Sequence, residues 1–120
     1  MSRTALVRAR AWSRSCDIAL RVYRALADLS AQPYAARVVA HALTIPETVA
    51  SAYAGAGHAF TDASFARGVE ALAVLQTQLY LAAECGLLPS TTLHVLNQDT
   101  DLLASELRAE LARVPAETGG

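Results

Sequence analysis

The sequence is poor in charge: only 18% of its 120 residues are charged, and none of them is lysine, because all ten basic residues are arginine. In contrast, 53% of the residues are hydrophobic. A single small domain hides only about two-thirds of the surface of its unfolded chain. The apolar excess therefore predicts contact with a partner, with another copy of the chain, or with a membrane.

Long hydrophobic runs are also missing. The longest stretches without a charged residue, 48–61 and 85–98, are 14 residues each. A helix needs about 20 apolar residues to cross a bilayer. The first twelve residues contain arginines but no apolar stretch of the kind found in secretory signals. We therefore expect no membrane partner and a cytoplasmic location.

Residue patterns for metal binding or catalysis are absent from the sequence. The two cysteines, Cys16 and Cys85, form no CxxC motif, and we expect both to be buried, reduced thiols. None of the three histidines has a second ligand at metal-binding spacing, and the Glu-x-x-His signature of di-iron bundles does not occur. The sequence predicts a protein that is not an enzyme and holds no metal or cofactor.

The arginines are concentrated near the start of the chain. Residues 1–37 contain seven arginines and two acids, whereas residues 38–120 contain three arginines and nine acids. Four arginines share one helical face and are the candidate nucleic-acid contacts: Arg10, Arg14, Arg21 and Arg24. The alternative is a solvated face, with Asp17 paired to Arg21 and Asp28 to Arg24 four residues apart. No aromatic residue lies between these arginines, which argues against stacking on single strands.

Four segments show a helical period and none alternates like a strand. The first runs from Arg8 to Leu29. Its expected core line is Trp12, Cys16, Ala19, Tyr23 and Leu26. Further apolar residues widen the apolar arc well beyond the roughly 100° of a surface helix: Ile18, Leu20, Val22 and Leu29.

The second segment begins near Pro33, and its expected core face is Tyr34, Val38, Ala42, Ile45, Val49 and Tyr53. Pro46 lies inside this pattern and removes one backbone hydrogen bond, so we expect a kink there. The kink frees a carbonyl near Ala42, which the hydroxyl of Thr44 or a water molecule can satisfy.

The third segment begins at Thr61, with Phe60 and Phe65 placed to form a hydrophobic staple. Its core line is Phe65, Gly68, Leu72, Leu75, Leu79 and Ala82, and Gly86 is the expected residue after its end. The fourth opens at Ser90, with a core line of Leu93, Leu96, Leu103, Leu107 and Leu111. These segments predict an all-α, antiparallel up-down-up-down four-helix bundle over 1–114 and a disordered tail over 115–120.

Apolar residues also occur on the back of the last two helices. The expected subunit interface consists of Val74, Leu81, Val95 and Leu102. The alternative is scattered surface residues, which are common in monomers. Gln76 falls inside the apolar arc of the third helix, where a buried amide needs partners. We expect a hydrogen bond to the second helix near its kink, or a ligand-binding role.

Several short motifs occur in an order that resembles a known family. They are Trp12, the Val22-Tyr23 pair, Thr44-Ile45-Pro46, Gln76-Thr77-Gln78-Leu79 and Gly86-Leu87-Leu88. From about residue 6 to residue 114 the chain resembles the four-helix-bundle family associated with 23S rRNA intervening sequences. That family is similar to the accessory variability proteins of diversity-generating retroelements.

The resemblance implies a homopentamer, a ring of five bundles, with a protein or structured RNA as further partner. The chain departs from the family pattern at residues 39 and 40, where Val39 and Ala40 occupy places that often hold a basic pair. Together, these observations predict a non-enzymatic oligomeric scaffold or interaction protein. The alternative is an RNA-binding or other nucleic-acid-binding accessory protein that uses the arginines of the first helix.

Overall fold

The computed structural model describes the backbone of residues 3–29, 31–54 and 61–118 and the side chains of residues 10–29, 31–54 and 63–112. Four long helices make up this part of the chain: α1 (Arg3–Leu26), α2 (Pro33–Ala54), α3 (Thr61–Glu84) and α4 (Ser90–Thr118). A short 3-10 helix, η1 (Ala27–Leu29), follows α1. Because no strand occurs in these ranges, the predicted all-α class is confirmed for them.

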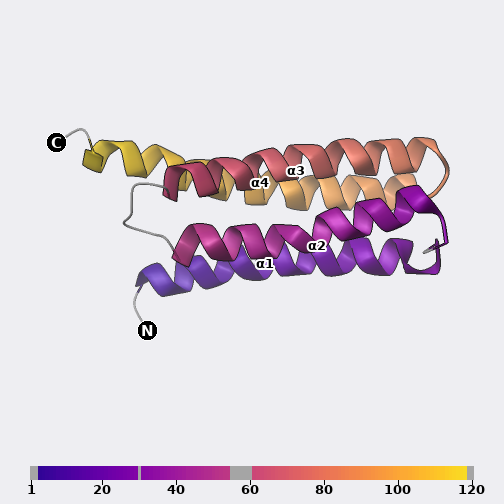
Figure 1. Ribbon diagram of the computed structural model, residues 1–120, viewed down its shortest axis with the longest axis horizontal. Coiled ribbons are helices and arrows are strands. Elements are labelled where there is room, and N and C mark those ends of the chain that lie inside the picture. Colours follow the sequence, from indigo (N-terminus) through magenta and orange to yellow (C-terminus); the bar gives the residue numbers. More distant parts are fainter. Residues whose placement is uncertain (1–2, 30, 55–60, 119–120) are drawn as a thin grey trace.

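The four helices enclose one core. Each helix packs against the next along the chain, and α1 also packs against α4, which completes the circuit. Their axes run lengthwise along a body of 51 × 27 × 22 Å (Figure 1). The turn after α1 and the turn between α3 and α4 lie at the same end of this body (Figure 1).

Local signals set the helix ends. The predicted starts at Pro33, Thr61 and Ser90 are all confirmed. At the end of α3, Gly86 has a positive φ of 79°. Its N–H donates to the carbonyl of Ala83 at 3.0 Å, and the N–H of Leu87 donates to the carbonyl of Ala82 at 2.9 Å. This pair of bonds is the Schellman motif, which satisfies carbonyls that a helix end leaves free.

Two further expectations about helix ends remain predictions. α4 runs to Thr118, so its helix passes the boundary that the sequence analysis places at residue 114. The division into a bundle over 1–114 and a tail over 115–120 stays a prediction. The staple between Phe60 and Phe65 involves a residue outside the described ranges.

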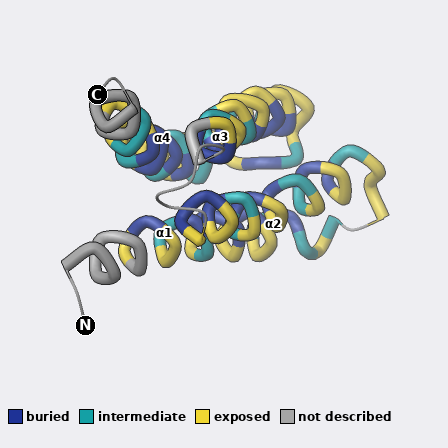
Figure 2. The backbone as a smooth tube through the Cα atoms, turned by 60° about the vertical axis from the view of Figure 1, so that its left-hand side comes forward, coloured by how far each residue is buried: buried dark blue, intermediate teal, exposed yellow. Residues whose placement is uncertain are grey.

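The core is built mainly from the expected lines of α2, α3 and α4. Its largest fully buried side chains are Phe65, Ile18, Leu26, Ile45, Leu72, Leu75, Leu79, Leu96, Leu103, Leu107, Val22 and Val38. In Figure 2 the buried stretches of the tube lie mainly where the helices face one another, and the exposed stretches lie along the outside of the body. The rings of Tyr53 and Phe65 meet edge to face, with centroids 5.0 Å apart. Gly68 lets α3 approach α4 closely, since a Cβ there would lie 2.9 Å from Cδ1 of Leu107.

The expected core line of α1 is only half right. Trp12 and Tyr23 are 45% and 50% exposed, whereas Ile18 and Val22 are fully buried. The apolar arc of α1 is wider than the surface that α2 and α4 cover, so one part of it faces the core and the other faces outward. Its inner part is Ala11, Ile18, Ala19, Val22 and Leu26.

Candidate functional site

The four candidate arginines of α1 do not form one free cationic stripe. Nε of Arg14 donates to Oε1 of Glu106 at 2.7 Å. Nη1 of Arg21 lies 3.8 Å from Oδ2 of Asp99. Both acids belong to α4, so the expected pairing of Arg21 with Asp17 on its own helix is wrong. The sequence period could not indicate these partners, because it says nothing about which helix lies beside α1.

Arg10 and Arg24 are exposed and belong to no ion pair among the residues with described side chains. The pairing predicted between Arg24 and Asp28 is therefore not formed there. The arginine face divides into an inner pair that holds α4 and an outer pair that is open to solvent. Only the outer pair can contact a ligand without giving up a carboxylate.

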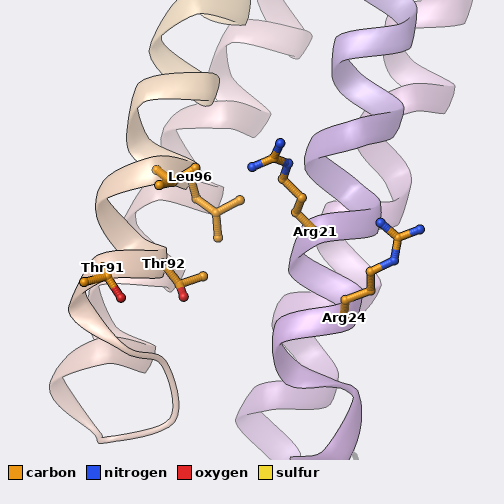
Figure 3. Close-up of a pocket in the computed structure, with 6 residues that line it drawn as sticks. Arg21, Arg24, Thr91, Thr92 and Leu96 are labelled. Atoms are coloured by element: carbon orange, nitrogen blue, oxygen red, sulfur yellow. The ribbon is translucent and has the colours of Figure 1, made fainter.

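A surface pocket lies where α1 meets the start of α4. It has a volume of about 350 Å³ and is lined by Arg21, Arg24, Thr91, Thr92, Val95 and Leu96. Figure 3 shows the guanidinium of Arg21 extending toward α4, whereas that of Arg24 turns away from it. The hydroxyls of Thr91 and Thr92 lie in the first turn of α4, where backbone N–H groups lack helical acceptors.

The chemistry of this pocket suits a small anionic group. Guanidinium and hydroxyl groups donate hydrogen bonds to phosphate or carboxylate, and the start of a helix favours negative charge. Asp99 works against this, because its carboxylate already lies beside Arg21. The sequence alone does not indicate either threonine as a site residue, since a Thr-Thr pair at a helix start is an ordinary capping signal.

A second pocket, of about 460 Å³, lies on the outer surface of α4. It is lined by Gln98, Asp99, Asp101, Leu102 and Ser105. The carboxylates of Asp99 and Asp101 give it negative charge, so it disfavours an anion. Its exposed Leu102 is one of the expected interface residues.

Gln76 bonds to α4 and not to α2. Its Nε2 donates to Oγ1 of Thr100 and to Oδ1 of Asp101, each at 2.7 Å. Thr100 is fully buried and its hydroxyl also donates to the carbonyl of Asn97. The predicted bond to the kink in α2 is wrong, because Gln76 lies on the flank of α3 that faces α4.

Contacts near Pro46 differ in detail from those expected. α2 changes direction partway along its length (Figure 1). The hydroxyl of Thr44 donates to the carbonyl of His41 at 2.6 Å, one residue before the carbonyl that Pro46 leaves free. Nε2 of His41 lies 2.9 Å from the carbonyl oxygen of Ala71 in α3. Because a carbonyl can only accept, that nitrogen carries the proton.

The four expected interface residues are all exposed, but they do not share one face. On α3, Val74 and Leu81 lie on the flank near Ala71, whose carbonyl faces α2. On α4, Val95 and Leu102 lie on the flank near Asp99, which faces α1. The α3 pair and the α4 pair therefore lie on opposite sides of the bundle. They suit two separate contacts.

Other features of the described side chains carry little chemistry. Cys85 is exposed, so its predicted burial is wrong, and Cys16 is half-buried; both are free thiols. In the described part of the chain, no cluster of three or more His, Cys, Asp or Glu side chains is placed to hold a metal ion. No helix within that same part has a stretch long and apolar enough to cross a membrane.

Comparison of the chain with protein-family models, with curated proteins and with solved structures found no match in any of the three.

Proposed function

We propose that this chain is a non-enzymatic scaffold, an antiparallel up-down-up-down four-helix bundle that self-associates and holds a protein partner. One observation carries the proposal: all four helices expose large apolar side chains, each 40–54% accessible. They are Trp12, Leu20, Tyr23, Leu43, Val74, Tyr80, Leu81, Val95 and Leu102. Large apolar surface of this kind is typical of an interaction site. The turn after α1 and the turn between α3 and α4 are short and lie at the same end of the body, which supports helices that alternate in direction.

The resemblance to the family associated with 23S rRNA intervening sequences supports five copies and stays part of this proposal. A ring is built from head-to-tail contacts, in which each subunit uses two different surfaces. Val74 and Leu81 on one side, with Val95 and Leu102 on the other, provide two such surfaces.

The test is the mass of the assembly in solution, measured by light scattering and native mass spectrometry. We expect a mass of several copies for the unmodified chain and a smaller one for the double variant Val74→Glu/Leu102→Glu. The control is Thr77→Glu/Ser105→Glu, which adds the same charge at exposed polar positions of the same helices. A monomer at all concentrations would rule out the scaffold as proposed.

A second function is favoured by the two arginines of the α1 stripe that belong to no ion pair among the described side chains: contact with nucleic-acid phosphates through Arg10 and Arg24. It is weaker because the chain has a net charge of −1 and because Arg14 and Arg21 already face carboxylates. Phosphate contacts release counterions, so binding of this kind falls steeply as salt rises.

The experiment compares binding of a structured RNA and a matched duplex DNA at low and moderate salt. Arg10→Glu/Arg24→Glu should abolish salt-sensitive binding. Arg37→Glu/Arg108→Glu, which makes the same change in charge at exposed positions off the stripe, should leave most of it. If the unmodified chain does not bind at low salt, the nucleic-acid function is wrong and the scaffold stands.

A further inference from the structure

The outward-facing part of the α1 apolar arc has no role in the bundle. Its exposed side chains are Trp12, Leu20 and Tyr23, and half-buried Cys16 lies among them at helical spacing. These four residues define the α1 row. The helical period places most of them in the core, and the two ring surfaces on α3 and α4 leave all of them uncovered.

Cross-helix contacts show where the α1 row lies. Arg14 and Arg21 reach carboxylates of α4 and so mark the α4 side of α1. At 100° per residue, the buried positions of α1 lie between these two arginines and the α1 row. It therefore lies on the flank of α1 that borders α2.

A matching row lies on α2. His41 reaches the carbonyl of Ala71 and so marks the α3 side of α2. Exposed Leu43 and half-buried Val39 lie on the other flank, which borders α1. The two rows therefore run along the outside of the α1–α2 seam. We refer to them together as the α1–α2 face.

Charge decides what can cover this face. Neither row contains a charged residue; the nearest charged residues by helical spacing are Glu47 on α2 and Arg24 on α1, at the edges of the face. A partner that buried its own charges over the two rows would lose their hydration and gain no counter-charge within them, at a cost of several kcal/mol. The face therefore requires an apolar, nearly uncharged partner surface, and the α1–α2 face of a second copy is one.

The size of the face is sufficient for a specific contact. Two adjacent helices, each about 10 Å wide and paired over about 33 Å of α2, present roughly 660 Å². Specific interfaces bury about 600–1,000 Å² on each partner. Trp and Tyr in the α1 row are residues that most often anchor such contacts.

We propose that two copies of this chain dock α1–α2 face to α1–α2 face around a two-fold axis. This inference rests on the proposed self-association and adds its surface and symmetry. A two-fold contact is compatible with a ring through α3 and α4, because the two contacts use different sides of the bundle. Combined with a ring of five copies, the two-fold contact joins two rings into an assembly of ten.

The decisive experiment compares two matched double variants by light scattering and native mass spectrometry. Leu20→Glu/Leu43→Glu places two charges in the α1–α2 face, and Val74→Glu/Leu102→Glu places two at positions outside it. The four side chains are similarly exposed, at 43–52%, so the variants should disturb the fold alike. We expect the first variant to halve the mass of the assembly. Circular dichroism and thermal unfolding confirm that each variant is folded.

Cys16 provides a second readout that needs no substitution. It lies in the α1 row, whereas Cys85 lies outside the face in the turn after α3. Alkylation of Cys16 should slow several-fold as the concentration rises through the assembly transition, while that of Cys85 stays constant. In Leu20→Glu/Leu43→Glu the concentration dependence at Cys16 should vanish.

Each remaining outcome overturns the inference. If only Val74→Glu/Leu102→Glu lowers the mass, the chain self-associates through the other surfaces and the scaffold proposal survives. If the unmodified chain is a monomer, both proposals fail. If Leu20→Glu/Leu43→Glu keeps the full mass but loses binding to vesicles of anionic lipid, the face contacts a membrane surface instead of a second copy.

Discussion

Arg14 of α1 and Glu106 of α4 join the first helix of the chain to the last. Nε of the arginine donates to the carboxylate at 2.7 Å, and both side chains are about 30% exposed, at 31% and 29%. No connecting segment holds these two helices together, because they are far apart in the sequence. The pair therefore helps to set which faces of α1 and α4 meet.

We expect Arg14→Ala and Glu106→Ala each to lower the free energy of unfolding. A double-mutant cycle should give a coupling of about 0.5–1 kcal/mol, since solvent partly screens a pair of this exposure. Urea unfolding at low and high salt measures it. A coupling that did not shrink in high salt would contradict an electrostatic origin.

Gly68→Ala should destabilise the bundle. The new Cβ would lie 2.9 Å from Cδ1 of Leu107, a side chain with no room to move because it is fully buried. Overpacking costs about 1–3 kcal/mol, and replacing a helical glycine by alanine returns about 1 kcal/mol. The expected net loss is therefore about 1 kcal/mol by urea unfolding.

Leu107→Val is the control for this prediction, because it removes the atom that clashes. In that background Gly68→Ala should become stabilising. If Gly68→Ala were equally destabilising with Val at 107, close packing of α3 on α4 would not be the reason for the glycine.

Gly86→Ala tests backbone strain alone. The residue has φ of 79°, and an added Cβ would meet no atom within 4 Å. The left-handed conformation costs an alanine about 1–2 kcal/mol, so the midpoint of urea unfolding should fall. Gly86→Asn should be milder, since asparagine visits this region more readily. Equal losses for the two variants would point to a cause other than φ.

The thiol of Cys16 should react slowly with iodoacetamide at pH 8. Burial, and secondly the neighbouring carboxylate of Asp17, raise the pKa of this thiol above its ordinary value, although hydrogen bonding with the Ser15 side chain lowers it. A raised pKa leaves less thiolate, the reactive form, at a given pH. The pH–rate curve should therefore lie at higher pH than that of an unstructured peptide of the same local sequence.

Asp17→Asn should move this curve back toward lower pH, because it removes a negative charge that opposes the thiolate. Asp28→Asn makes the same change in net charge further along the chain and should leave the curve in place. The rates are compared at protein concentrations too low for assembly. A curve unmoved by Asp17→Asn would show that burial alone raises the pKa.

The helices and most of the core could be predicted from the sequence, because the signals for them are local. Pro33, Ser90 and Gly86 mark helix ends through backbone geometry alone. The 3.6-residue period places most of the inward residues of α2, α3 and α4 correctly, because a residue's place on the helical face follows from its spacing along the chain.

The partners of individual side chains depended on the tertiary structure. Gln76 bonds to α4 where the sequence favoured α2, and Arg21 faces Asp99 where it favoured Asp17. Such contacts depend on how far each helix is rotated and shifted against its neighbours, which no local period encodes.

The sequence by itself determined that α1 carries too much apolar surface for one core, because composition and period are properties of the chain. Only the tertiary structure decided which part of that surface is the excess. Packing against α2 and α4 buries Val22 and leaves Trp12 and Tyr23 outside. The reason is geometric: a helix with two neighbours can turn only part of its circumference toward them.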